Sequence, residues 1–204
     1  MNKSTLYSVH PGVKMMQDWM ESLPKKTGKS LEEWVNLLNK EGPTDFKERK
    51  EWLKEKHGFG TNTAWWIADY AEGKLPWEGD PESYLLAAGQ YVEQMFAKSK
   101  SSLRPLYDKL LSCALEIGED VKACPCKTIV PLYRNHVFAQ IKPTTIKRLD
   151  LGLALKGTPY TGRLLDTGGS AKKDRITHRI PIFQLSDIDE EIIHWLKTAY
   201  QMDQ

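Results

Sequence analysis

The sequence predicts an α+β protein, in which an N-terminal helical bundle precedes a C-terminal domain made of one helix, a four-stranded antiparallel sheet and a second helix. Two observations predict this class. Apolar residues recur at helical spacing through the first half, and in the second half they form short alternating runs separated by turns. We expect a helical domain at residues 1–79, a connecting helix and hinge at 80–100, and an α+β domain with a basic sheet at 101–204.

The first two helices carry clear end signals. The first begins at His10-Pro11 and ends by Gly28. The second begins at Ser30, which forms a capping box with Glu33, because each side chain can bond the other's backbone amide. This helix ends near Gly42-Pro43.

Two further helices complete the predicted helical domain. One is capped by Thr44 or Asp45 and ends at Gly58, and a short one runs from about Asn62 to Ala71. The segment from His57 to Ala64 between them resembles the phosphate-binding hairpin of helix-hairpin-helix modules. The alternative is a glycine C-cap followed by an Asn62 N-cap, and the acidic residues around the segment favour this alternative.

A break at Leu75–Pro81 separates the two halves, and Asp80 caps a helix that has Pro81 at its first position. The composition of Lys98–Ser102 is typical of a hinge. A helical stripe then opens the C-terminal domain and ends at Gly118. Its apolar positions are Leu103, Leu106, Leu110, Ala114 and Ile117.

Four strands are predicted after this stripe, at Thr128–Tyr133, His136–Ile141, Ile146–Leu155 and Ile176–Leu185. The first three are antiparallel neighbours, since a parallel crossover needs a longer connection. A final helix follows a cap at Ser186 or Asp187. We expect both helices of this domain to cover one face of the sheet and to leave the other face to solvent or a partner.

Several classes of function lack a signature. No apolar run is long enough to span a bilayer, and the start Met1–Ser4 leads into no signal peptide, so we expect a cytoplasmic protein without membrane contact. The three cysteines, Cys113, Cys124 and Cys126, are expected to be reduced thiols, because no second ligand pair lies near enough to complete a metal site. We expect no cofactor and no metal, and the absence of a catalytic motif favours a binding protein over an enzyme.

A glycine-rich loop at Gly157–Leu164 has the spacing of a nucleotide-binding P-loop. Arg163 and Leu164 stand where that motif needs Lys and Ser or Thr, so we predict a mobile lid or binding loop instead. His136 and His178 fall on separate predicted strands and could face each other across the sheet. We expect both to be partly exposed, with one or the other adding to an anion site.

The charge distribution is the strongest functional signal. The chain has a formal net charge of +2, but Val121–Ile180 holds twelve Lys or Arg against three Asp, which gives this segment +9 and the remaining residues −7. A basic module joined to an acidic one indicates an anionic partner for the basic part. The alternative is that the basic sheet docks on the acidic domain or on another copy of the chain.

Several motifs carry a family resemblance. Thr27–Trp34, Glu51–Lys54 and His57–Gly60 resemble a small helical bacterial domain of unknown function. A second set resembles another bacterial domain of unknown function that is also appended to restriction-endonuclease-like proteins, which implies nucleic acid as a partner and brings no catalytic residues. This second set is Leu103–Tyr107, Phe138–Pro143, Leu149–Leu153, Thr177–Arg179 and Ala199–Tyr200.

The predicted function is therefore binding of nucleic acid or another polyanion by the basic sheet. A protein–protein adaptor, including self-association, and an enzyme that uses Arg134, His136 and Arg179 on a small anionic substrate stay open as alternatives. The predicted polyanion-binding residues are Lys127, Arg134, His136, Lys142, Lys147, Arg148, Arg163 and Arg179, with Tyr133 and Phe138 as stacking platforms.

Overall fold

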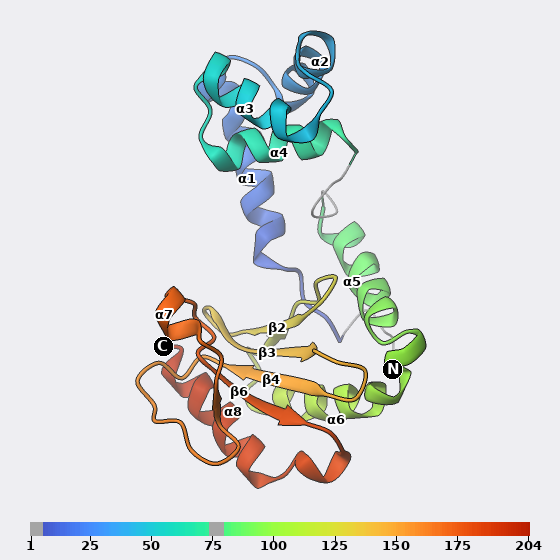
Figure 1. The fold of residues 1–204 in the computed structure, drawn as a ribbon, viewed down its shortest axis with the longest axis vertical. Coiled ribbons are helices and arrows are strands. Elements are labelled where there is room, and N and C mark those ends of the chain that lie inside the picture. The colour runs from blue at the N-terminus through green and yellow to red at the C-terminus, as the bar shows by residue number, and fades with distance from the viewer. Residues whose placement is uncertain (1–5, 74–79) are drawn as a thin grey trace. The chain divides into compact units, whose positions relative to one another are not determined.

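The computed structural model describes residues 6–73 and 80–204, so the predicted break at Leu75–Gly79 lies outside the described residues. These residues form two compact units (Figure 1). One unit is His10–Tyr84, and the other joins the residues up to Val9 to Leu85–Gln204. We call them the helical unit and the α+β unit.

The helical unit contains α1 (Pro11–Thr27), α2 (Leu31–Glu41), α3 (Phe46–His57) and α4 (Thr61–Ala71). They surround an apolar core because each helix presents a stripe of large side chains at helical spacing. The core residues Leu38, Leu53 and Ile67 are all fully buried.

The caps of these helices confirm most of the end signals. The Ser30 hydroxyl accepts from the Glu33 amide at 3.2 Å, and the Glu33 carboxylate accepts from the Ser30 amide at 2.6 Å, which completes the predicted capping box. Gly28 and Gly58 end α1 and α3 in the left-handed conformation. The predicted cap at Asn62 is wrong, since Gly60 occupies the N-cap position of α4 and Asn62 lies inside the helix.

The helix α5 (Pro81–Met95) begins as predicted, because one oxygen of Asp80 accepts from the amides of Glu82 and Ser83, each at 3.0 Å. The stretch predicted as a hinge is instead a 3-10 helix, η2 (Lys98–Leu103). Its residues are anchored: Leu103 is buried, and the Lys100 ammonium donates to the Pro143 carbonyl at 2.7 Å. The helix α6 (Arg104–Leu115) follows directly.

The sheet of the α+β unit has six antiparallel strands in the order β1-β2-β3-β4-β6-β5. The four predicted strands correspond to β2 (Val130–Tyr133), β3 (Val137–Pro143), β4 (Leu149–Leu153) and β6 (His178–Ile182). The other two, β1 (Lys122–Ala123) and β5 (Leu165–Asp166), are two-residue edge strands, too short to show alternation in the sequence.

Two short helices and a long one complete this unit: α7 (Gly169–Lys172), η3 (Leu185–Asp187) and α8 (Glu190–Met202). The cap of α8 is Asp189, whose carboxylate accepts from the Ile192 amide at 3.2 Å, rather than Ser186 or Asp187. The predicted cap residues lie in η3 instead, because that turn precedes the helix.

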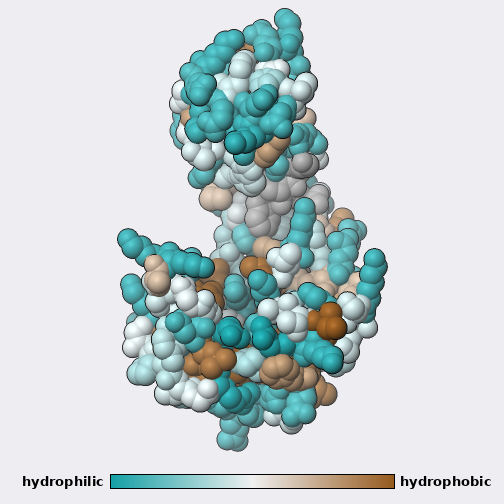
Figure 2. Space-filling model, viewed as in Figure 1, coloured by the Kyte–Doolittle hydropathy of each residue, from teal (hydrophilic) through white to brown (hydrophobic). Residues whose placement is uncertain are grey.

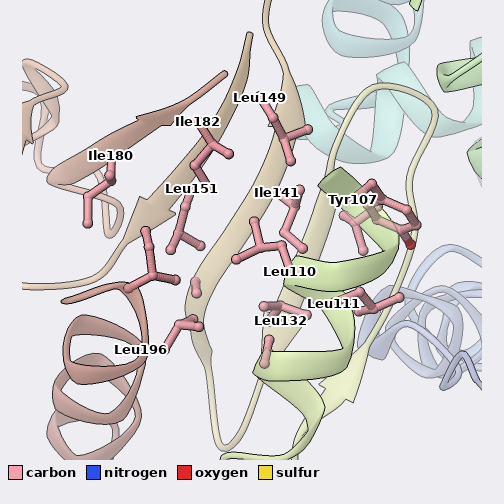
Figure 3. Close-up of a cluster of buried hydrophobic side chains, with 14 of the residues drawn as sticks. Tyr107, Leu110, Leu111, Leu132, Ile141, Leu149, Leu151, Ile180, Ile182 and Leu196 are labelled. Carbon is pink, nitrogen blue, oxygen red and sulfur yellow. The ribbon is translucent and has the colours of Figure 1, made fainter. Parts of the chain in front are cut away.

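The helices α6 and α8 cover the same face of the sheet, as predicted (Figure 1). Leu110 of α6 and Leu196 of α8 point toward strand side chains such as Ile141 and Leu151 (Figure 3). This packing removes a large apolar area from water and is the main stabilising contribution to the unit. We call the opposite side of the sheet the open face.

Candidate functional site

The open face carries the side chains that alternate with the buried leucines and isoleucines of the central strands. The register aligns Lys142 of β3 with Asp150 of β4 and Pro181 of β6. The neighbouring row aligns Gln140 with Gly152 and Arg179. Polar and charged residues therefore meet on this face of three adjacent strands.

An ionic cluster occupies one end of the open face. Asp150 is 8% exposed, and its carboxylate lies 3.0 Å from Nε of Arg148 and 3.7 Å from Nη1 of Arg179. The Arg148 contact is an ion pair without good hydrogen-bond geometry through Nε, although Nη2 donates to the other carboxylate oxygen at 3.3 Å. The Thr144 hydroxyl donates to the same oxygen at 2.6 Å. One carboxylate thus holds two guanidinium groups.

Lys142 adds a third cation to this cluster. It stands opposite Asp150 in the register and is exposed. Within residues 6–73 and 80–204, its ammonium has no ion pair. We call Lys142, Arg148, Asp150 and Arg179 the open-face cluster, and its cations exceed its carboxylate by two. Exposed Lys147 lies beside it in the β3–β4 turn.

Three other predicted cations are neutralised elsewhere. Arg134 donates to Asp120 at 3.2 Å and to the Tyr200 carbonyl at 3.2 Å, and its guanidinium lies 4.3 Å from the centre of the Tyr200 ring. A hydrogen bond from the Tyr200 hydroxyl, together with the one from Arg134, holds the pKa of Asp120 below its ordinary value. Arg134 is therefore committed to a contact between the sheet and α8.

His136 and Arg163 are committed in the same way. The buried carboxylate of Asp203, which is 2% exposed, accepts from the His136 amide at 2.8 Å and lies 3.0 Å from the His136 ring nitrogen Nδ1. Arg163 contacts Asp189 at 2.6 Å and Glu191 at 3.1 Å. The enzyme alternative placed Arg134, His136 and Arg179 in one cleft, but these residues bind three different carboxylates.

The two predicted stacking residues, Phe138 and Tyr133, differ in how deeply they are buried. Phe138 is fully buried at a β-bulge, and its ring packs edge-on against Tyr200 with 5.7 Å between the centroids. Its prediction as a stacking platform is wrong, because no base can reach it. Tyr133 alternates with buried Leu132 and is half-buried, and burial raises the pKa of its hydroxyl to about 12. Lys127 is exposed in the loop between β1 and β2.

A second basic feature is a pocket of about 490 Å³ beyond the end of β4. Figure 1 shows α7 and the C-terminus side by side in this part of the α+β unit. Ion pairs are absent for Lys156 and Lys173 in the described part of the chain. The lining residues are Ala154, Lys156, Ser170, Lys173, Asp174, Arg175, Thr177 and Met202. We call this the basic pocket.

The wall of the basic pocket includes Thr177, which is 1% exposed and whose hydroxyl lies 2.7 Å from Nδ1 of His178. The other ring nitrogen, Nε2, lies 3.0 Å from the Thr158 carbonyl, which can only accept. In a neutral ring Nε2 therefore carries the proton, and the Thr177 hydroxyl donates to Nδ1. His178 thus anchors the glycine-rich loop and does not face His136, contrary to the sequence prediction.

Lys156, Lys173 and Arg175 belong to the basic segment Val121–Ile180 but are not among the predicted site residues. A local signal existed in the run Lys172-Lys173-Asp174-Arg175, which follows two glycines, Ser170 and Ala171. Lys173 and Arg175 line one pocket with Lys156 because of the path that the loop takes past the end of β4. No sequence pattern predicts that path.

The helical unit offers a groove of opposite charge. A groove of about 680 Å³ runs from the end of α2 along α3, and its charged lining residues are five carboxylates and Lys47. The carboxylates belong to Glu41, Asp45, Glu48, Glu51 and Glu55. These charges would repel a phosphate backbone. Gly58 acts as the C-cap of α3, with its amide 3.0 Å from the Lys54 carbonyl, which confirms the glycine C-cap of the alternative for the His57–Ala64 segment.

No group of three or more His, Cys, Asp or Glu within the described residues is placed to hold a metal ion. None of the helices in this part of the chain is long and apolar enough to cross a membrane.

These features define a protein with a helical unit and an α+β unit that carries cationic groups on the sheet face opposite α6 and α8. Residues 92–203 match the family described as Domain of unknown function (DUF5655), and residues 15–73 match Domain of unknown function (DUF4287). The first match spans more than half of the chain, so the chain belongs to the DUF5655 family. No curated protein and no solved structure matches the chain.

Proposed function

We propose that the α+β unit binds nucleic acid or another polyanion through the cations of the open face. The observation that supports this proposal is the open-face cluster, in which three cations gather around one carboxylate on the side of the sheet that α6 and α8 leave uncovered. Lys147 beside the cluster and Lys127 on the neighbouring loop extend the cationic area.

The chemistry of the cluster suits phosphate. Arg148 and Arg179 are held by Asp150, so less side-chain entropy is lost when they contact a ligand. Lys142 and Lys147 provide charges that no carboxylate of the described chain offsets. Phosphate contacts by such groups are independent of base sequence, and each one releases counterions from the nucleic acid.

The side of the α+β unit that Figure 2 draws is mixed in character. Figure 2 shows hydrophilic side chains with separate hydrophobic patches over the α+β unit. A basic surface of this kind fits a cytoplasmic bacterial protein with access to nucleic acid. It also fits the resemblance of the C-terminal motifs to a domain found beside restriction-endonuclease-like domains.

The proposal is tested by fluorescence anisotropy with labelled single- and double-stranded DNA. The Lys142→Gln/Lys147→Gln double variant removes two exposed charges without touching a buried partner, so it should fold and bind more weakly. The matched control is Lys109→Gln/Lys197→Gln, which removes two exposed charges from α6 and α8 on the covered side. No binding by the native chain at low salt, or equal loss in both variants, would overturn the proposal.

A protein–protein adaptor is the second candidate, favoured by exposed apolar side chains after β6. Phe183 is 59% exposed and Leu185 is 54% exposed. Aromatic and aliphatic anchors of this size often dominate protein interfaces. Self-association measured by sedimentation should then be insensitive to salt and be lost in a Phe183→Ser/Leu185→Ser variant, whereas a monomer at all concentrations would exclude self-association through these residues.

A further inference from the structure

We propose that the basic pocket is a binding site for a small phosphate monoester, separate from the open-face cluster and independent of the nucleic-acid proposal. Lys156 and Lys173 are the direct ligands of the phosphate. The remainder of the ligand lies against Ala154 and Met202, which also line the pocket.

Charge is the first argument for this site. Three cations and one carboxylate line the pocket. Arg175 is held in place, because its Nε donates to the Val137 carbonyl at 2.8 Å and its Nη2 contacts the Asp203 carboxylate. Lys156 and Lys173 are without ion pairs in the described ranges, so an anion in the pocket would be attracted by both.

The polar groups of the pocket form the second argument. The Thr177 hydroxyl is buried and its direction is fixed by His178, which fixes the polar wall of the pocket. Because the Thr177 proton is donated to His178, it is the Ser170 hydroxyl at the rim, and not that of Thr177, that can donate to a phosphate. A divalent cation does not fit this set of residues, since a single carboxylate stands among three positive charges.

The loop that carries Lys173 is held in a defined conformation. Lys173 has a φ of 59°, in the left-handed region that non-glycine side chains avoid. The Asp174 amide donates to the Gly169 carbonyl at 2.9 Å. A side chain at Gly169 would collide with the Ile176 carbonyl oxygen, so this position requires glycine. The lysine is thus presented on an ordered loop.

Size and lining identify the class of ligand. A volume of about 490 Å³ falls in the range of small-molecule sites, roughly 300–1,000 Å³, and exceeds what a bare phosphate needs. The apolar groups of Ala154 and Met202 favour an organic part attached to the phosphate. A nucleic acid, in contrast, carries phosphodiesters, and its backbone would have to enter and leave the pocket as a continuous chain. The pocket therefore suits a phosphate monoester better.

The test is a titration of the full chain with inorganic phosphate, followed by amide NMR at constant ionic strength. We expect saturable shifts confined to the amides of residues 154–157 and 168–177. Lys156→Gln and Lys173→Asn, the latter chosen because Asn tolerates the left-handed region, should each weaken binding at least about tenfold, equivalent to about 1.4 kcal/mol.

Two controls separate this site from general charge effects. Lys172→Gln removes an adjacent exposed lysine that does not line the pocket, so it should leave phosphate affinity unchanged. Lys142→Gln/Lys147→Gln should also leave it unchanged while weakening DNA binding. Shifts that do not saturate, or an equal loss in Lys172→Gln, would overturn the site without affecting the open-face proposal.

Discussion

Individual carboxylates determine which cations of this protein are available. Asp150 and Asp203 are buried, and a buried charge is tolerated only with partners. Asp203 binds His136 and Arg175 and so ties the last residues of the chain to the β2–β3 turn and to the loop before β6. Asp150 instead gathers Arg148 and Arg179 on the open face.

The role of Asp203 predicts a large effect on stability. Asp203→Asn removes the charge that pairs with Arg175 and His136, and we expect the free energy of unfolding to fall by about 2–3 kcal/mol. Urea denaturation followed by circular dichroism measures this change. The control, Asp108→Asn, breaks an exposed pair with Arg104 and should cost less than about 1 kcal/mol. Equal losses of unfolding free energy in the two variants would contradict the stabilising role assigned to Asp203.

The cysteines should be unreactive in the folded protein. Burial raises the pKa of the Cys124 thiol to about 12 and that of Cys126 to about 11. Because a raised pKa lowers the thiolate fraction, both should react slowly with a disulfide reagent at pH 8, whereas all three cysteines should react quickly in urea. Fast labelling of Cys124 or Cys126 without denaturant would show that this part of the chain opens readily.

At the scale of elements, end signals were the reliable part of the sequence prediction. Ser30 and Asp80 specify helix starts through bonds within four residues, so the sequence contains all the required information. Lys98–Ser102 was misassigned because its polar composition suits a hinge, whereas contacts of Lys100 and Leu103 with distant residues make it a 3-10 helix. The two-residue strands β1 and β5 exist only through their neighbours.

The capping box of α2 predicts a measurable contribution to the helical unit. Ser30→Ala removes the oxygen that accepts from the Glu33 amide, and we expect a loss of about 1 kcal/mol in the free energy of unfolding. Ser30→Asp keeps an acceptor at the same position and should restore most of the stability. If thermal denaturation shows no difference between Ser30→Ala and Ser30→Asp, the cap contributes little.

The start of α8 predicts a dependence on pH. Burial raises the pKa of Asp189, but the Ile192 amide and Arg163 outweigh this effect and hold the pKa below its ordinary value. A carboxylate of this kind stabilises the fold above its unfolded pKa and loses that contribution as the pH falls through its folded pKa. Asp189→Asn should therefore be less stable than the native chain at pH 7, and the difference in urea denaturation should shrink in acid. A difference that is constant with pH would contradict this.

For the whole molecule, the segment of +9 predicted from the sequence does not become one cationic surface. Acids outside that segment pair with three of its twelve basic residues: Asp120 with Arg134, Asp203 with Arg175, and Asp189 with Arg163. These pairs join residues far apart in the chain, and charge counting cannot report them. The sequence did predict the open face itself, because alternation fixes which strand residues oppose the helices.

The remaining claim is that cations of the open face contact nucleic acid phosphates. The most direct measurement is the dependence of DNA affinity on salt for the native chain, Lys142→Gln/Lys147→Gln and the Lys109→Gln/Lys197→Gln control. Each lost phosphate contact reduces the slope of log affinity against log salt by about 0.9, so the first variant should show a slope smaller by about 2 and the control an unchanged slope. Identical slopes in all three proteins, or no binding at low salt, would contradict the account.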